Sequence, residues 1–220
     1  APDETRIYRL NAGVEGVIRE ISAVTTGSQV TKDQWLATFS AHEARAPVQS
    51  YLVTLGVLDH QSQNEMEAPA QTRAANESSQ IAIDRLRNLG ISTIQIEEIR
   101  RTREVPATYR ILAPADGFVL ARNFSSGLKF EKGLEWCRIA DLSKVWILAN
   151  VFEREVKYIT PGISARISLP YQEQVYTARV TDVPPQFDTA TRTLKVRLEA
   201  DNPGFVLRPD MFVDIEFLIP

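Results

Sequence analysis

The 220-residue sequence is poor in the side chains that most often build catalytic and metal centres. It has one cysteine, Cys137, and two histidines, His42 and His60. A single cysteine excludes a disulfide within the chain, and no further ligand lies at metal-binding spacing from the histidines. The two methionines, Met66 and Met211, are too far apart in the sequence to suggest a thioether cluster. We therefore expect neither a metal centre nor a bound cofactor.

Other absences narrow the possible functions. The formal net charge is −3, whereas a nucleic-acid-binding domain normally carries a basic excess. No apolar run approaches the roughly 20 residues that are needed to span a bilayer. The phosphate-binding, dinucleotide-binding and nucleophile-elbow glycine motifs are also missing. Cys137 lies in a predicted strand between Trp136 and Arg138, which favours a small core residue over a nucleophile. We predict that the chain is not an enzyme and has no nucleic-acid partner.

What the sequence does contain is an internal repeat, which fixes architecture before any local prediction. From Gly27 onward two segments correspond at a constant offset of 100 positions. The pairs are Gly27 with Gly127, Val30 with Phe130, Lys32 with Lys132, Leu36 with Trp136 and Phe39 with Ile139. Each half alternates apolar and polar residues and turns at glycine, as half-buried strands do. We predict that residues 10–39 and 109–142 pack face to face into one small β-sandwich.

The segment between the halves, residues 40–108, reads as helical. Val48, Tyr51, Leu55 and Leu58 recur at helical spacing and give one apolar face. Ser40 and Glu43 have the spacing of a capping box. Pro47 is tolerated only in a first turn, so we expect either a short turn over 40–45 followed by the helix, or a kink.

The chain then reverses direction within a strongly polar stretch that contains Pro69, a residue suited to a turn or to a helix's opening position. Gly90 is placed to cap the end of the return helix. Ser92 with Gln95 makes a second capping box for a short third helix, which we expect Pro106 to end. The insert is therefore predicted to be a hairpin of about three helices. A helical subdomain packed on the sandwich is the alternative.

Residues 143–220 return to β-structure. Short strands such as "ARISL", "YTARVTDV" and "TLKVRLEA" are separated by turn residues at Pro161–Gly162, Pro184–Pro185 and Asn202–Gly204. Several such strands at short spacing predict a small antiparallel barrel, which residues 1–9 join as a lead-in strand. Met211 is expected in the barrel core.

Several ordered stretches carry a family resemblance. The two glycine-turn halves flanking an insert, together with "RLRNLGISTIQIEEI", "ILAPADGFV" and "IADLSKVWILANVFEREV", resemble the HlyD-like membrane fusion proteins, or periplasmic adaptors, of tripartite efflux systems. Within that family the chain is most similar to the heavy-metal, copper/silver-type branch that works with RND pumps. The runs "DTATRTLKVR" and "NPGFVLRPDMFVDI" resemble the adaptor β-barrel, although Asp210 stands where the family usually has glycine.

The resemblance implies a mainly β fold with an α-helical hairpin insert: a split lipoyl/biotinyl-type β-sandwich, a short hairpin and an antiparallel β-barrel domain. It implies a periplasmic adaptor that links an inner-membrane efflux transporter to an outer-membrane channel protein, with self-association into a hexamer. The membrane-proximal domain and the segment that associates with the inner membrane are expected to lie outside this chain. The copper branch carries metal-binding methionines near its N-terminus, and none stands near Ala1 here.

We predict that the channel contacts the far end of the hairpin, where polar residues cluster: Gln63, Asn64, Glu65 and Arg73. An ordinary solvated turn is the alternative for each of them. Three further functions stay open. The chain could serve a drug-efflux or type I secretion system of the same architecture, act as a lipoyl or biotinyl carrier through Lys32 or Lys132, or be a purely structural envelope protein.

Overall fold

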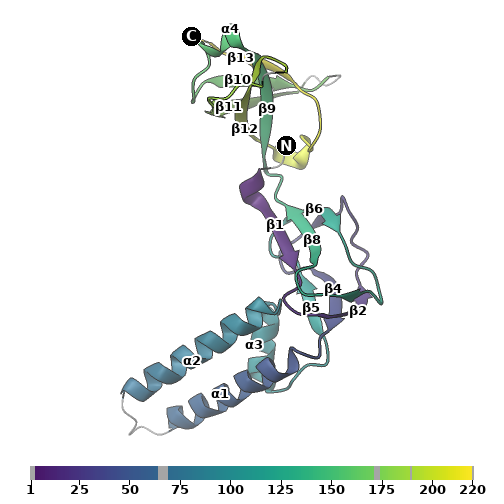
Figure 1. Ribbon diagram of the computed structural model, residues 1–220, viewed down its shortest axis with the longest axis vertical. Helices are drawn as coiled ribbons and strands as arrows, with labels where there is room; N and C mark the ends of the chain where they lie inside the picture. Colours follow the sequence, from purple (N-terminus) through teal and green to yellow (C-terminus); the bar gives the residue numbers. More distant parts are fainter. Residues whose placement is uncertain (1–2, 64–68, 171–173, 189, 220) are drawn as a thin grey trace. The chain divides into compact units, whose positions relative to one another are not determined.

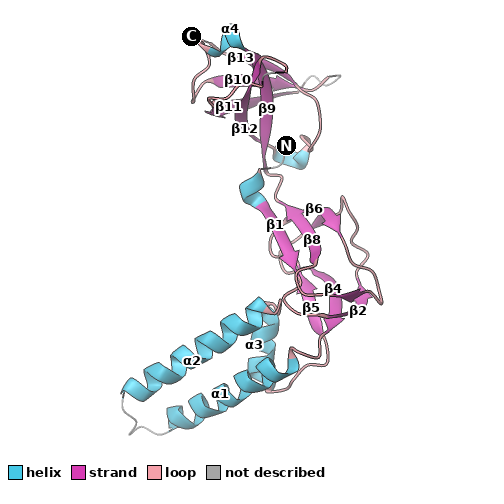
Figure 2. Cartoon of the chain, in the orientation of Figure 1, coloured by secondary structure: helices cyan, strands magenta, loops and turns pink. Residues whose placement is uncertain are grey.

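The structure, a computed structural model, describes residues 3–63, 69–170, 174–188 and 190–219, and only the backbone of 61–63 and 69–75. The chain divides into two compact units. One comprises Tyr8–Ile139 and the other combines Ala1–Ile7 with Ala140–Pro220. The first unit carries the strands of the repeat and the long helices, and the second is built mainly of strands (Figure 2). The predicted fold class, mainly β with a helical hairpin insert, is confirmed.

In the first unit the described strands form two four-stranded sheets. One sheet has the order β1 (Ile7–Asn11), β8 (Glu135–Ala140), β6 (Gly117–Arg122) and β3 (Gln29–Val30). The other has the order β5 (Tyr109–Leu112), β4 (Trp35–Ser40), β2 (Gly16–Ile21) and β7 (Lys129–Phe130). Strands β1 to β4 of the first half correspond in order to β5 to β8 of the second. When each strand is replaced by its counterpart, the order of one sheet becomes the order of the other. Each half thus gives two strands to each sheet. The expected sandwich is present, but the halves interlock instead of forming one layer each.

The backbone hydrogen bonds repeat with the strands. The N–H of Gly27 donates to the carbonyl of Val119 at 2.8 Å, and the N–H of Gly127 donates to that of Ile18 at 2.9 Å. Both glycines have a positive φ, +87° and +81°, which L side chains rarely adopt. The offset between equivalent positions is 101 before this turn and 100 after it, so the first half holds one extra residue there.

An aromatic cluster fills the space between the two sheets. The ring of Phe39 lies 5.5 Å from Tyr109 and 5.0 Å from Trp136, measured between centroids. Phe130 meets Trp136 edge-on at 5.2 Å. All four rings are buried, as is the thiol of Cys137, which confirms the predicted core position of that cysteine. Aromatic pairs at these separations add to the stabilisation that burial gives.

Three helices stand between β4 and β5: α1 (Arg45–Gln63), α2 (Pro69–Asn88) and α3 (Thr93–Thr102). Figure 1 shows α1 and α2 side by side. Pro47 falls in the first turn of α1, in line with the short-turn alternative. The capping box predicted for Ser40 and Glu43 is wrong, because Ser40 is the last residue of β4 and its hydroxyl accepts a hydrogen bond from Arg19 Nε at 2.8 Å. The charged guanidinium of Arg19, on the neighbouring strand β2, is a stronger donor to this hydroxyl than a backbone N–H of the helix.

The other helix ends follow the sequence more closely. Pro69 is the first residue of α2, and Gly90, with φ at +87°, follows its end. The hydroxyl of Ser92 accepts from the N–H of Gln95 at 3.3 Å and caps α3, as predicted. The expectation that Pro106 ends α3 is wrong. The helix stops earlier, at Arg103, whose φ of +60° is left-handed.

Close backbone approach joins the helices to the sandwich. A Cβ atom on Gly13, in the turn between β1 and β2, would lie 2.0 Å from the carbonyl oxygen of Asn88 at the end of α2. Only glycine permits this contact, because 2.0 Å is far inside the contact distance of carbon and oxygen. The same region buries Leu86 and Ile91. The C-terminal end of α2 is therefore held against the sandwich by backbone as well as by side chains.

The second unit is an antiparallel sheet on its own core. The order is β13 (Asp214–Phe217), β10 (Ser164–Ser168), β11 (Val175–Asp182), β12 (Thr193–Asp201) and β9 (Lys144–Phe152). Three short helical segments accompany it: η1 (Glu4–Arg6), α4 (Glu153–Val156) and η2 (Pro203–Phe205). Strand β9 buries every second residue, including Val145 and Val151. Met211, expected in this core, is 45% exposed. That expectation is wrong, because Met211 lies in the connection between β12 and β13 and its sulfur accepts from the N–H of Arg208.

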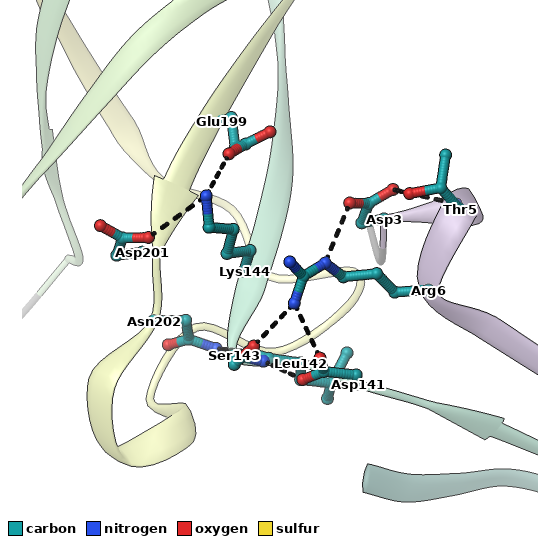
Figure 3. Close-up of polar contacts among 10 residues, drawn as sticks. All are labelled: Asp3, Thr5, Arg6, Asp141, Leu142, Ser143, Lys144, Glu199, Asp201 and Asn202. Atoms are coloured by element: carbon teal, nitrogen blue, oxygen red, sulfur yellow. Dashed lines mark hydrogen bonds and ion pairs between the residues drawn. The ribbon is translucent and has the colours of Figure 1, made fainter. Parts of the chain in front are cut away.

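A polar network ties the N-terminal segment to the entry of β9 (Figure 3). Arg6 Nη1 lies 2.8 Å from Asp141 Oδ2 and 3.0 Å from the hydroxyl of Ser143. Arg6 Nε lies 3.6 Å from the carboxylate of Asp3, which is buried and accepts from Thr5. Residues that are far apart in the sequence are thus joined by one guanidinium.

Asn202, which is 1% exposed, completes this part of the second unit. Its side-chain amide donates to the carbonyls of Leu142 and Leu207, at 2.8 Å and 2.7 Å, and its oxygen accepts from the N–H of Leu207. Nearby, the amine of Lys144 lies 2.8 Å from the carboxylate of Glu199 (Figure 3). The buried amide satisfies backbone groups that no strand partner satisfies, which is why a polar side chain is stable there.

Two glycine substitutions should move stability in opposite directions. Gly13→Ala should lower the free energy of unfolding by at least about 2 kcal/mol, because its Cβ would collide with backbone that cannot shift cheaply. Gly56→Ala, inside α1 with nothing within 4 Å of the new Cβ, should raise it by about 0.5–1 kcal/mol through helix propensity. Urea unfolding followed by circular dichroism measures both. Equal changes in the free energy of unfolding for the two variants would show that α2 does not approach the β1–β2 turn as closely as described.

The Arg6 network should make stability depend on pH. Burial alone would raise the pKa of Asp141, but hydrogen bonds from Ser143 and Arg6 outweigh it and hold that pKa below its ordinary value of 3.8. A carboxylate with a depressed pKa stabilises the folded state above its unfolded pKa, and this contribution is lost as pH falls through the folded value.

Asp141→Asn removes that titration. The loss of stability between pH 7 and about pH 3 should therefore be smaller in the variant than in the wild type, as measured by urea midpoints at the two pH values. Asp188, whose pKa is also lowered, mainly by backbone hydrogen bonds, is retained in both proteins and cancels in the comparison. Parallel pH profiles would remove Asp141 from this role.

Candidate functional site

The predicted channel-binding residues lie at the far end of the α1–α2 pair. Gln63 is the last residue of α1 and Arg73 lies in the second turn of α2. Their side chains, and all of Asn64 and Glu65, lie outside what the structure describes. The backbone brings the ends of the two helices to the same end of the pair (Figure 1). The contact role of these four residues stays a prediction.

The predicted apolar seam holds α1 and α2 together near the sandwich. Val48, Tyr51 and Leu55 are buried on α1, and Leu86 is buried on α2. Burial raises the pKa of Tyr51, and nearby charges have smaller effects: that of Arg100 lowers this pKa and that of Glu97 raises it. The phenol therefore remains neutral at physiological pH and serves the packing of α1.

Other faces of the helices carry exposed apolar side chains. On α1, Val53 is 68% exposed and Val57 is 48% exposed, and on α2 Ile81 is 69% exposed. Val53 and Val57 are four positions apart and so lie on one face of the helix. On α3, Ile94 is 45% exposed, whereas Ile96 and Ile99 are buried.

The joint between the arm, which we define as α1–α3, and the sandwich depends on a buried amide. Gln95 is 5% exposed. Its Nε2 donates to the carbonyl of Thr108 at 3.2 Å, and its Oε1 accepts from the N–H of Arg110 at 2.9 Å. The guanidinium of Arg110 in turn pairs with Glu98 of α3. The sequence predicted only a capping role for Gln95, and no local pattern indicates that it reaches a strand.

A second contact fastens α3 to α1. Arg103 Nη2 lies 2.6 Å from the carboxylate of Asp59, and both side chains are about half exposed. Exposed ion pairs contribute at most about 1 kcal/mol each. This pair therefore orients α3 along α1 more than it stabilises the fold.

The lysines considered for a carrier role are placed in equivalent turns. Lys32 lies between β3 and β4, and Lys132 between β7 and β8, and both are exposed. The N–H of Lys32 donates to the carboxylate of Asp116 at 2.6 Å. A swinging carrier lysine needs the tip of the hairpin that joins the halves, and between β4 and β5 this chain has the helical arm. Neither lysine occupies the carrier position.

The residues able to ligate metal are dispersed. Within the described residues, no group of three or more histidine, cysteine, aspartate or glutamate side chains could hold a metal ion. His42 and His60 are both exposed and are separated by much of α1. Burial raises the pKa of Cys137 to about 11, so its sulfur is neither a thiolate ligand nor a nucleophile at neutral pH.

The second unit presents an apolar groove. Its volume is about 380 Å³, and it runs between β9 and the connection that leads to β13. Leu148, Met211 and Phe212 line it and are exposed, Phe212 to 91%. A solvated aromatic ring beside a groove is typical of surfaces that contact other proteins. Sequence reasoning missed this groove because it placed Met211 inside the core.

No helix among the described residues is long and apolar enough to cross a membrane. The candidate functional features among the described residues are surfaces: a helical arm, its joint with the sandwich and a groove on the five-stranded sheet of the second unit. Such features suit binding more than chemistry.

Comparison with known proteins gives two family matches in order along the chain. Residues 6–141 match the CzcB-like barrel-sandwich hybrid domain, and residues 144–218 match the CusB-like beta-barrel domain. The first match covers both halves of the repeat together with the arm between them. The boundary between the matches falls close to the division between the two compact units.

Individual relatives agree with the family matches. The chain is 25% identical over 210 residues to the SilB protein of Salmonella typhimurium, covering 95% of this chain and 45% of SilB. It is 25% identical over 204 residues to the cation efflux system protein CusB of Escherichia coli O6:H1, covering 92% of this chain and 46% of CusB. The chain thus spans about half the length of these relatives.

Among solved structures the fold is similar to that of ZneB from Cupriavidus metallidurans. The TM-score is 0.62 at 24% sequence identity, and the match covers 98% of this chain and 94% of ZneB. At this identity the likeness concerns the fold, and the family matches carry the assignment. The chain belongs to the CusB/CzcB-like family of membrane fusion proteins.

Proposed function

We propose that this chain is the core of a periplasmic adaptor that links an inner-membrane RND-type efflux transporter to an outer-membrane channel and serves the export of heavy-metal cations. The observation that carries the proposal is the pair of family matches, which together extend over residues 6–218. One relative over most of this length is named as a cation efflux system protein. The chain is not an enzyme in this proposal, and it binds its partners without a cofactor.

The fold supports a mechanical role. The arm offers a narrow apolar seam for its own pairing and polar residues toward its far end. A helical hairpin of this kind stays in solution yet can pack against helices of a partner. We assign the channel contact to this end of the arm, through Gln63, Asn64, Glu65 and Arg73.

The other surfaces have roles in the same proposal. The five-stranded sheet of the second unit, with its apolar groove beside Phe212, contacts the transporter. The sandwich packs beside its neighbours in a ring of six copies. Association with the inner membrane belongs to the same proposal.

The substrate class can be tested in the organism that encodes the chain. Deleting the gene should lower tolerance to copper, silver, zinc or cobalt salts and leave dye and antibiotic susceptibility unchanged, because the proposed assembly exports cations. Growth across a concentration series of each compound is the measurement, with complementation by the intact gene as the control. Raised dye or antibiotic susceptibility with metal tolerance intact would instead indicate a drug-efflux adaptor.

The channel contact can be tested by charge reversal. Arg73→Glu should weaken cross-linking of the full-length adaptor to its outer-membrane channel several-fold, since interfacial charges are matched between partners. Arg85→Glu is the matched control, because Arg85 is an exposed arginine on the same helix near the sandwich end. Equal cross-linking of the wild type and both variants would exclude Arg73 from the contact.

A further inference from the structure

A positively charged cleft lies at the base of the arm, where the chain leaves β4 for α1 and returns to β5. Its volume is about 490 Å³. Arg19, Ser40, His42 and Arg45 line it together with the apolar Val105 and Pro106. No carboxylate is among its lining residues in the described part of the chain. The cleft therefore carries two formal positive charges and no negative charge to balance them.

The two arginines differ from others of the same unit in their ionic contacts. Arg100, Arg103 and Arg110 each pair with a carboxylate, whereas among the described residues Arg19 and Arg45 have no such pair. An adjoining cleft shares Arg19, Ser40 and His42, and there two glutamates balance Arg19 and Lys129. Of these two clefts, only the first has an excess of positive charge among its lining residues.

One of the two charges is restrained by a neighbouring strand. Arg19 Nε donates to the hydroxyl of Ser40 at 2.8 Å, a contact that does not use the terminal amino groups of the guanidinium. Arg45 is the first residue of the 19-residue helix α1, whose N-terminus itself favours negative charge. A planar guanidinium presents its donors in a fork that matches the two oxygens of a carboxylate.

The rest of the lining decides the class of occupant. Val105, Pro106 and Ala107 place apolar surface beside the arginines, and the buried ring of Tyr109 lies among them. A free inorganic anion would gain nothing from that surface. A carboxylate side chain next to an aliphatic one in a protein segment would be recognised by both parts of the cleft.

We propose that this cleft is a docking site for an acidic protein segment, in which a glutamate or aspartate binds Arg19 and Arg45 and a neighbouring aliphatic side chain packs on Val105 and Pro106. The site is distinct from the far end of the arm, and it does not depend on which substrate the assembly exports. The cleft lies where the chain passes from β4 to α1 and from α3 back to β5, so an occupant would contact both the sandwich and the arm.

The 220-residue chain can be titrated with the peptide acetyl-Glu-Leu-Glu-Leu-amide, with binding measured by calorimetry and by amide chemical shifts. The peptide should bind, shift the amides of residues 40–45 and 105–109, and bind more weakly as salt rises. The Arg19→Gln/Arg45→Gln double variant should bind at least about tenfold more weakly, because bidentate charged contacts are lost. Arg101→Gln, which removes an exposed arginine outside the cleft, should bind like the wild type.

Three controls keep the proposal open to refutation. Arg19→Lys keeps the charge and should bind at an intermediate level, because a lysine lacks the planar fork. Far-ultraviolet circular dichroism of each variant confirms folding, and Arg45→Gln alone tests the cleft without disturbing the Ser40 hydrogen bond. Equal affinity of the double variant and the wild type, or equal binding of acetyl-Gln-Leu-Gln-Leu-amide, would overturn the proposal. Full displacement by millimolar inorganic phosphate would overturn it as well, in favour of a small-anion site.

Discussion

The hydrogen-bonded pairing of β4 with β5 is the constraint on which the rest of this chain depends. These strands flank the helical arm in sequence, yet Phe39 lies opposite Tyr109 and Thr38 opposite Arg110 in the same sheet. Neighbouring strands are about 4.8 Å apart, so both ends of the arm are fixed at one place. The long insert consequently leaves and rejoins the sandwich at a single base, beside paired strands of one sheet.

Two buried amides perform the same task in the two units. Gln95 bonds the backbone where the chain enters β5, and Asn202 bonds the backbone where it enters β9. β5 is an edge strand with β4 on one side only, and Leu142 and Leu207 lie outside the strands, so the backbone polar groups at both points need partners that no sheet neighbour provides. Removing either amide would leave buried donors and acceptors without partners, which costs more than the hydrogen bonds contribute. The backbone polar groups at these two connections are thus hydrogen-bonded, as are those within the sheets.

The sequence predicted the structure correctly at positions where local backbone preference alone determines the conformation. The offset between Gly27 and Gly127 predicted equivalent turns, and Pro69 and Gly90 marked the ends of α2, because backbone conformation at such residues depends little on distant contacts. The prediction failed at Ser40, where Arg19 from another strand outcompetes the helix for the hydroxyl. It also failed at Met211, since hydrophobicity alone does not separate a core position from a groove.

The same distinction applies to the candidate site. A cluster of polar residues identified the far end of the arm, and this remains a prediction. The cleft of Arg19 and Arg45 could not be predicted, because it is formed by residues from three sheet strands, a helix start and a returning loop. Nor could periodicity show that the halves interlock, since alternation within a strand does not say which sheet the strand joins.

The interlocked halves have a consequence for how such a fold could arise. Each half contributes two strands to each sheet, so one half alone would have every strand beside an empty place. Two identical copies of that half could fill each other's places as an entwined homodimer. The present chain realises this arrangement within one molecule, with the arm as the covalent link between the halves. The first half holds one extra residue before Gly27, and the halves still complete each other's sheets.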